Sequence, residues 1–233
     1  MTLTVDETAY RSLIRERLAD IRERIGAACA RSGRSADEVT LVAVTKYIDA
    51  SRTALLAQEG VRHCGENRWQ SAQEKVASGI PVQWHFIGPL QRNKAGKVAH
   101  SFDWVHSVDR AALAVDLSRF AAEGGRTLSV LVQVNQSGEP QKAGVAPHDA
   151  EGLLAQCLTL QGLSLQGLMT IGRQGQGAAA TLREFAGLRK LRGDLCARLG
   201  VDLPHLSMGM SDDYELAVEE GATLVRIGRA LVL

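Results

Sequence analysis

Hydrophobic positions near the start of the chain recur with helical spacing. Apolar side chains stand three or four residues apart, with arginine and glutamate between them, at Ile14, Leu18, Ile21, Ile25 and Ala28. Gly33 follows this run as a stop signal. The pattern predicts one amphipathic helix over residues 6–31, whose apolar stripe must cover another part of the protein.

Beyond that helix, short β-rich runs alternate with amphipathic stretches. The runs that predict strands are Leu41–Lys46, Val61–Gly65, Val82–Gly88, Trp104–Val108, Leu128–Asn135, Leu165–Ile171, His205–Met210 and Thr223–Gly228. The stretches that predict helices are Ser51–Glu59, Gln70–Ala77, Ala111–Glu123, Pro147–Leu160, Thr181–Leu199 and Asp212–Glu220. A repeated strand-helix unit indicates parallel strands joined by right-handed crossovers.

About eight such units predict an α/β fold of the (β/α)8 TIM-barrel type, whose active site lies at the C-terminal ends of the strands. A doubly wound open sheet is the alternative. The barrel is favoured because nearly every predicted strand ends in polar or reactive residues, whereas an open sheet concentrates its chemistry at one switch point. The chain has the length of one barrel, and no linker or repeat divides it. We expect a single domain over residues 1–233, with the leading helix, residues 6–32, packed on the barrel.

Composition narrows the possible partners. The 27 lysines and arginines nearly balance the 26 aspartates and glutamates, so no overall field favours nucleic acid or an anionic membrane. The four cysteines are scattered, without the spacing of a metal or redox motif. No signal peptide or membrane span is recognisable. We therefore expect a cytoplasmic protein that binds neither metal, membrane nor nucleic acid.

Lys46 closes the first predicted strand, in an apolar run. Since side chains alternate along a strand, Val42, Val44 and Lys46 share one face, and a run this apolar is predicted to be buried on both sides. A buried lone ammonium group is costly unless it loses its proton or has a function. The usual function is a Schiff base with an aldehyde or ketone.

Arg226 is a second cation inside an apolar run, near the end of the last strand. A buried guanidinium needs a fixed acceptor, which is either a carboxylate of the barrel or an atom of a ligand, such as a ring nitrogen. Beside it, Ser211 precedes a helix and Gly228 follows the last strand. Ser211 is either the N-cap of that helix or part of a phosphate site.

An aldehyde, a pyridine nitrogen and a phosphate would satisfy Lys46, Arg226 and the Ser211/Gly228 turn together. Pyridoxal 5′-phosphate (PLP) carries all three groups. PLP is therefore the cofactor that these residues predict.

The chain also resembles the pyridoxal-phosphate homeostasis proteins, single-domain barrels related to the N-terminal domain of alanine racemases, which are PLP-binding barrels of fold type III. The matching segments run in the order of that family and cover almost the whole chain: Val42–Lys46, Gly65–Asn67, Trp84–Lys94, Lys142–Gly144, Gly167–Met169, Leu206–Asp212 and Val225–Gly228.

This resemblance implies a role for each matched residue. Lys46 would hold PLP as an internal aldimine and Arg226 would donate to the pyridine nitrogen. Ser211 and the backbone N–H groups of Gly228 and Arg229 would bind phosphate. The other pocket-lining positions implied are Asn67, His85, Met169 and Ser207. A histidine on an apolar strand is otherwise more often a core histidine, and this alternative stays open for His85.

Two basic segments have alternative interpretations. Pro89–Lys97 is either a solvated helix start or a loop that guides an anionic cofactor, and Lys142 is either a turn lysine or part of the same mouth. One departure from the resemblance concerns phosphate. Arg229 stands where similar proteins often have a small hydroxyl residue, so only its backbone is assigned to phosphate.

The expected function is that of a carrier, without catalytic residues, that binds PLP and takes part in its intracellular homeostasis. Such a protein would act as a monomer and pass PLP to PLP-dependent apo-enzymes. The main alternative is an amino-acid racemase-like enzyme, but Tyr10, Tyr47 and Tyr214 are not predicted to supply its opposing base. A cofactor-free Schiff-base aldolase, or another phosphate-binding barrel, would leave Arg226 unexplained.

Overall fold

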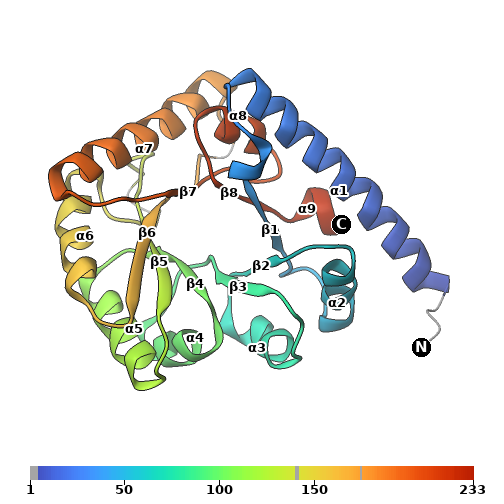
Figure 1. The fold of residues 1–233 in the computed structure, drawn as a ribbon, viewed down its shortest axis with the longest axis horizontal. Helices are drawn as coiled ribbons and strands as arrows, with labels where there is room; N and C mark the ends of the chain where they lie inside the picture. The colour runs from blue at the N-terminus through green and yellow to red at the C-terminus, as the bar shows by residue number, and fades with distance from the viewer. Residues whose placement is uncertain (1–4, 140–141, 174) are drawn as a thin grey trace.

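Eight parallel strands close into a barrel in chain order, with β8 paired to β1 (Figure 1). This computed structural model describes residues 5–139, 142–173 and 175–233. The strands are β1 Thr40–Val44, β2 His63–Glu66, β3 Gln83–Phe86, β4 Trp104–Val108, β5 Leu128–Gln133, β6 Leu163–Met169, β7 His205–Ser207 and β8 Leu224–Ile227. The predicted (β/α)8 barrel is confirmed, and the open-sheet alternative is wrong.

Helices form a ring around the barrel (Figure 1). They are α1 Val5–Arg31, α2 Ala50–Gln58, α3 Trp69–Ala77, α4 Ala95–Ser101, α5 Ala111–Glu123, α6 Ala150–Thr159, α7 Ala178–Leu199, α8 Tyr214–Glu219 and α9 Arg229–Val232, with short 3-10 turns η1 Ala36–Glu38, η2 Arg92–Lys94 and η3 Pro147–Asp149. The sequence pattern does not predict α4 or α9, which have seven and four residues. Within the described ranges, no helix is long and apolar enough to cross a membrane.

The leading helix α1 lies across the outside of this ring, beside α8 and α9 (Figure 1). Its apolar stripe is buried, from Ile14, which is 0% exposed, to Ile25, which is 5% exposed. At its end Arg31 pairs with Glu219 at 2.6 Å. The stripe therefore covers the part of the barrel wall where the last strand-helix unit meets the first.

The core has two layers, which the alternation of side chains along each strand separates. On β1, Ala43 faces the helices and belongs to the large cluster between barrel and ring. Val42 faces inward, where it packs in a small cluster with Leu131, Met169 and Leu224. The rest of the barrel interior is polar, which departs from the branched apolar filling usual in this fold.

Several predicted strands run past the observed ones at their C-terminal ends. Leu41–Lys46 was expected, but β1 ends at Val44, and β7 ends at Ser207 rather than at Met210. Backbone pairing continues briefly beyond these ends, as in the bond from Thr45 N–H to the Gly65 carbonyl at 3.0 Å. The chain then turns away, so the residues after each strand line the mouth of the barrel.

Gly88 is a position where the fold requires glycine. A Cβ atom there would lie 2.2 Å from the backbone oxygen of Asn67. We expect Gly88→Ala to lower the free energy of unfolding by about 1–3 kcal/mol, because a backbone atom cannot move aside as a side chain does. Urea unfolding measures this change. Gly26→Ala, where a Cβ meets nothing within 4 Å in α1, is the control and should not destabilise the protein.

Candidate functional site

A cavity of about 300 Å³ opens at the C-terminal end of the barrel, between β1 and β8. Its lining comes from the ends of β1, β3 and β8, from the loop after β7 and from the start of α9: Val44, Lys46, Tyr47, Ile87, Met210, Ser211, Asp212, Arg226, Gly228 and Arg229. Five of the nine residues predicted to bind a cofactor are brought together here: Lys46, Ser211, Arg226, Gly228 and Arg229. Its volume is at the lower end of the range for small-molecule sites.

Lys46 lies at the rim of this cavity and is exposed, not buried. The prediction of burial was wrong because β1 ends two residues earlier, at Val44. The predicted face was right, since Val42 lies inside the barrel and Val44 and Lys46 line the cavity. The Lys46 Nζ atom lies 4.9 Å from the centre of the Tyr47 ring. The lysine amine is therefore accessible to a ligand that enters from solvent.

Strand alternation continued past Lys46 would point Tyr47 away from the interior, but its side chain lines the cavity and is 45% exposed. The chain turns after β1, and Ile48 N–H donates to the Thr45 carbonyl at 3.1 Å. This turn replaces strand alternation, so the two adjacent side chains both reach the cavity. Sequence periodicity carries no signal for such a turn.

A buried ion pair holds the residue before Lys46. The Lys75 Nζ atom of α3 donates to the Glu66 carboxylate and to the Thr45 carbonyl, each at 2.6 Å. The Thr45 hydroxyl also donates to Glu66, at 2.6 Å. Glu66 is 0% and Lys75 4% exposed. Through these bonds, α3 and β2 fix the turn that carries Lys46.

Arg226 is buried on β8, as its sequence context predicts. Its hydrogen-bond partners are the Ser207 hydroxyl at 2.6 Å and the Thr170 carbonyl at 3.0 Å, rather than a barrel carboxylate. Burial lowers the pKa of Arg226 to about 10, an effect that Asp213 partly offsets. These two bonds use two of five N–H donors. The guanidinium thus keeps its charge, and it has further N–H groups that can donate to a ligand in the cavity.

The sequence leaves two roles open for Ser211, and the structure excludes the first, that of N-cap of the helix after β7. The helix α8 begins at Tyr214, and it is the Asp213 carboxylate that accepts from the Met210 N–H, at 2.6 Å. The Ser211 hydroxyl instead accepts from the Ala230 N–H of α9 at 3.4 Å. Burial raises the pKa of Asp213. Ser211 therefore joins the loop after β7 to the start of α9.

The start of α9 completes the rim. A Cβ atom at Gly228 would lie 3.2 Å from the Val44 Cβ and 3.4 Å from the Tyr47 ring, so glycine allows this close approach. The Arg229 side chain is exposed and pairs with Asp212 at 2.6 Å. The Asp212 carboxylate beside the cavity is therefore paired with a cation, which reduces its repulsion of an anion there.

The other four predicted residues lie outside this cavity. Asn67 lines a neighbouring cavity of about 610 Å³ at the mouth, together with Lys94 of the basic segment after β3. Met169 belongs to the apolar cluster inside the barrel. Ser207 and His85 are fully buried in the interior below the cavity. Of these, Ser207 reaches the site through its bond to Arg226.

His85 has two histidine partners that the sequence does not reveal. Its Nε2 atom lies 3.0 Å from the Nδ1 atom of His63, and its Nδ1 atom lies 2.9 Å from the Nε2 atom of His106. Burial holds the pKa values of His85 and His106 well below that of a free histidine. The two histidines are therefore neutral at neutral pH.

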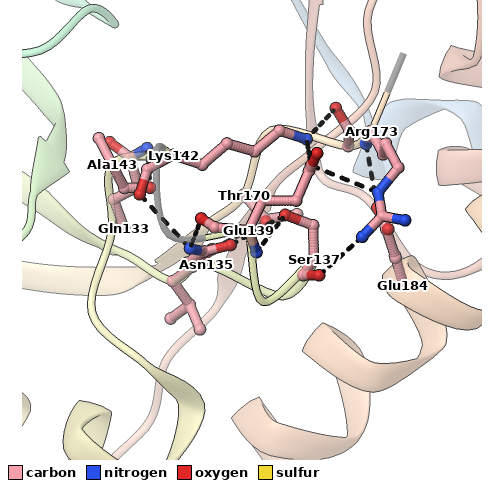
Figure 2. A network of polar contacts seen from close by, with 11 residues as sticks. Gln133, Asn135, Ser137, Glu139, Lys142, Ala143, Thr170, Arg173 and Glu184 are labelled. Carbon is pink, nitrogen blue, oxygen red and sulfur yellow. Dashed lines mark hydrogen bonds and ion pairs between the residues drawn. The ribbon is translucent and has the colours of Figure 1, made fainter. Parts of the chain in front are cut away.

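Lys142, part of the Lys142–Gly144 motif, is tied into a loop network beside the mouth (Figure 2). It pairs with Glu139 at 2.7 Å, and Arg173 reaches the same carboxylate at 3.3 Å. The Asn135 amide donates to the Glu139 carbonyl at 2.8 Å, and the Arg173 N–H donates to Glu184 at 3.1 Å. These contacts join the loops after β5 and β6.

The chain is a closed parallel barrel, with a lysine just past its first strand and a buried arginine on its last strand. These features place it among proteins that bind ligands at the C-terminal end of a single barrel. The family model described as "Alanine racemase, N-terminal domain" matches residues 17–233. The "Pyridoxal phosphate homeostasis protein" of Pseudomonas aeruginosa is 45% identical over 222 residues, which cover 94% of this chain and 95% of the relative. The protein of the same name from Escherichia coli K12 is 39% identical, with 94% and 95% coverage. The chain belongs to the pyridoxal phosphate homeostasis protein family.

Solved structures agree with this assignment. PipY of Synechococcus elongatus PCC7942, with PLP bound, superposes with a TM-score of 0.84 and 39% identity, covering 94% of this chain and all of that one. The alanine racemase of Corynebacterium glutamicum superposes with a TM-score of 0.75 but only 15% identity, and 61% of its chain is covered. The second likeness shows that the barrel fold is shared.

Proposed function

We propose that this protein binds PLP in the cavity between β1 and β8 and carries it reversibly, as part of PLP homeostasis. The names of the relatives and the PLP in the PipY structure support this proposal. The observation that carries it is that Lys46 and Arg226 line one cavity, although 180 positions separate them in the chain.

The residues around the cavity fit the three groups of the cofactor. Lys46 offers an accessible amine to an aldehyde. Arg226 offers N–H donors to a ring nitrogen, and its protein partners do not neutralise its charge. For the phosphate we assign the Ser211 hydroxyl and the backbone N–H groups of Gly228 and Arg229, at the third side of the cavity. The first N–H groups of a helix lack partners within that helix.

PLP supplies an aldehyde that condenses reversibly with an amine and releases water. Arg226 orients the ring by donating a hydrogen bond, and it keeps its own proton because its pKa of about 10 is far above neutral pH. The exposed rim leaves Lys46 open to water, which favours release as well as capture. These properties suit a carrier.

The racemase-like alternative needs a base across the ring from the lysine. Tyr47 is the tyrosine that lines the cavity in the described part of the chain, and its ring lies beside the Lys46 amine at 4.9 Å. A base next to the lysine cannot serve the opposite face of a substrate. The placement of Tyr47 thus favours the carrier over the enzyme.

The proposal extends to the setting of the protein. We propose one cofactor-binding domain that works as a cytoplasmic monomer and supplies PLP to apo-enzymes. All four cysteines are free, and Cys29, Cys64 and Cys157 are buried, as suits a reducing compartment. An accessible Lys46 would let a partner protein approach the cofactor.

Mixing the purified protein with PLP is expected to give a yellow absorption band, which borohydride converts into a permanent label on Lys46. Peptide mass spectrometry locates this label. Lys46→Ala should lose both the band and the label, because it removes the amine. Lys94→Ala, at the neighbouring cavity, should keep both. A label of equal yield in Lys46→Ala would contradict the proposed site. Turnover of L- or D-amino acids at enzyme-like rates would contradict the carrier function.

A further inference from the structure

Below the cavity, five polar side chains form a continuous chain of hydrogen bonds across the barrel interior. Arg226 donates to the Ser207 hydroxyl at 2.6 Å, and the Ser207 oxygen lies 2.9 Å from the Nδ1 atom of His106. His106 contacts His85 at 2.9 Å, and His85 contacts His63 at 3.0 Å. We call Ser207, His106, His85 and His63 the histidine relay. It comes from four strands, β7, β4, β3 and β2.

The arginine determines the direction of this chain. A guanidinium has only donors, so the Ser207 oxygen must accept from Arg226. The single hydroxyl hydrogen of Ser207 can then point to the Nδ1 atom of His106. If His106 carried its proton on Nδ1 instead, the Ser207 oxygen would accept from both Arg226 and His106, and its own buried hydroxyl hydrogen would need a different acceptor. Leaving a buried donor without an acceptor is costly.

The direction of each hydrogen bond determines that of the next one along the relay. His106 accepts at Nδ1 and therefore donates from Nε2 to the Nδ1 atom of His85. His85 in turn donates from Nε2 to the Nδ1 atom of His63. Each imidazole is then neutral with its hydrogen on Nε2. Desolvation first, and then neighbouring histidines, hold the pKa values of both His85 and His106 well below the ordinary value, and Arg226 adds to this effect at His106.

The surroundings hold the relay rigid and dry. Trp104 stacks on His85 with ring centres 5.4 Å apart and an angle of 12° between the planes. His85, His106 and Ser207 are 0% exposed. Hydrogen bonds in such a low-dielectric interior are strong, and a missing partner is correspondingly expensive. The geometry of one member therefore constrains the next.

The far end of the relay opens at the other end of the barrel. His63 is the first residue of β2 and lines a cavity of about 440 Å³, beside Arg22 of α1 and Arg62. Its donor Nε2–H can thus be satisfied by solvent. The relay runs from the cavity that Lys46 lines to this N-terminal cavity.

We propose that the histidine relay positions Arg226, with His106 as the positioning residue that locks the Ser207 hydroxyl as the acceptor for the guanidinium. A carboxylate would also hold Arg226, but it would neutralise the charge. A neutral relay fixes the guanidinium and leaves its charge to an acceptor in the cavity. This inference rests on the proposed function only for the identity of that acceptor.

The tautomers give a test that needs no cofactor. Nitrogen-15 NMR of the protein without PLP, near pH 7.5, should show hydrogen on Nε2 and none on Nδ1 for both His85 and His106. A charged imidazole, or hydrogen on Nδ1 of either residue, would overturn the relay whatever the protein binds. This result does not depend on whether PLP binding is found.

Substitution of His106 tests the positioning role. His106→Phe leaves Ser207 without its acceptor and should weaken PLP binding about tenfold and shift the absorption band of the bound cofactor. His106→Asn, whose side-chain oxygen can replace Nδ1 as the acceptor, should restore binding to within about threefold. His205→Phe is the matched control, because His205 bonds to Thr223 outside the relay. It should leave affinity and band unchanged.

Two results would overturn the positioning role. One is an equal loss of affinity in His106→Phe and His205→Phe, which would indicate a general effect of filling the interior. The other is a His106→Asn variant that folds but binds as weakly as His106→Phe. If His106→Phe does not fold, His106→Asn and the tautomers decide the question. If no variant and no wild-type protein binds PLP, the proposed function fails, and the tautomers still test the relay.

Discussion

Replacing Glu66 with alanine is expected to lower the free energy of unfolding by about 3–5 kcal/mol. The substitution leaves the Lys75 ammonium group buried without its carboxylate, and the two groups lie 2.6 Å apart in the folded protein. It also removes the acceptor of the Thr45 hydroxyl. Removing one member of a buried ion pair costs far more than removing both. Urea unfolding, monitored by tryptophan fluorescence, measures the loss.

Two variants separate this effect from a general response to losing a carboxylate. Glu123→Ala breaks an exposed pair with Arg119 and should change stability by less than about 1 kcal/mol. The double variant Glu66→Leu with Lys75→Met removes both charges and should recover most of the lost stability. A Glu66→Ala protein as stable as Glu123→Ala would contradict the buried pair. Because the pair holds Thr45, Glu66→Ala should also reduce borohydride labelling of Lys46.

Acid should destabilise the protein strongly below pH 6.5. His85 and His106 have pKa values well below the ordinary 6.5 in the folded state, because both are buried. The unfolded chain regains the ordinary value, so between these two pKa values it binds more protons than the folded protein. The contribution of the two neutral histidines to the free energy of unfolding is fully present above pH 6.5, and it is lost as the pH decreases below that value. Each histidine contributes a slope of about 1.4 kcal/mol per pH unit.

Urea unfolding between pH 7.5 and 5.5 measures this slope. In the same window His63 and His205, whose pKa values burial also lowers, act in the same direction. Carboxylates with lowered pKa values, such as Glu59 beside Arg15, lose their contribution only at lower pH. His148→Ala is the control, because that side chain is 81% exposed and should not affect the slope. A stability that stays constant from pH 7.5 to 5.5 would contradict neutral interior histidines.

The polar interior explains the expected sensitivity to acid. A TIM barrel is usually filled by branched apolar side chains. Here histidines, Ser207 and Arg226 share the interior with a small apolar cluster. Polar groups in that position are stable only when each one is hydrogen-bonded and uncharged, or is a cation that serves a ligand. We infer that the histidines that hold the Arg226 guanidinium in place also make the protein less stable in acid.

Local patterns were enough to predict the barrel. The alternation of apolar runs and amphipathic stretches depends on neighbouring residues, and it predicted strands that correspond to all eight observed ones. Alternation along β1 also predicted that Val42, Val44 and Lys46 share a face. The helices α4 and α9, of seven and four residues, were missed.

Errors at the site have one physical cause. The sequence predicts that Lys46 is buried and offers Ser211 as a helix cap. Both predictions assume that regular structure continues to the last residue of a pattern. The chain leaves its strand at Val44 and starts α8 only at Tyr214. The end of a strand depends on backbone partners from neighbouring strands, and the start of α8 depends on the turn that follows β7, neither of which the periodicity of side chains contains.

By itself, the sequence determined a parallel barrel, a lysine near the C-terminal end of its first strand and on the side of Val42 and Val44, and a buried arginine on its last strand. Each of these follows from the period of side chains and from the cost of burying charge. Only the tertiary structure decided which predicted residues share a cavity and which partners hold Arg226. Closing the barrel brings His63, His106 and Ser207 from distant strands within one hydrogen-bonded chain. Such contacts depend on strand register around the whole barrel, which no segment of the sequence encodes alone.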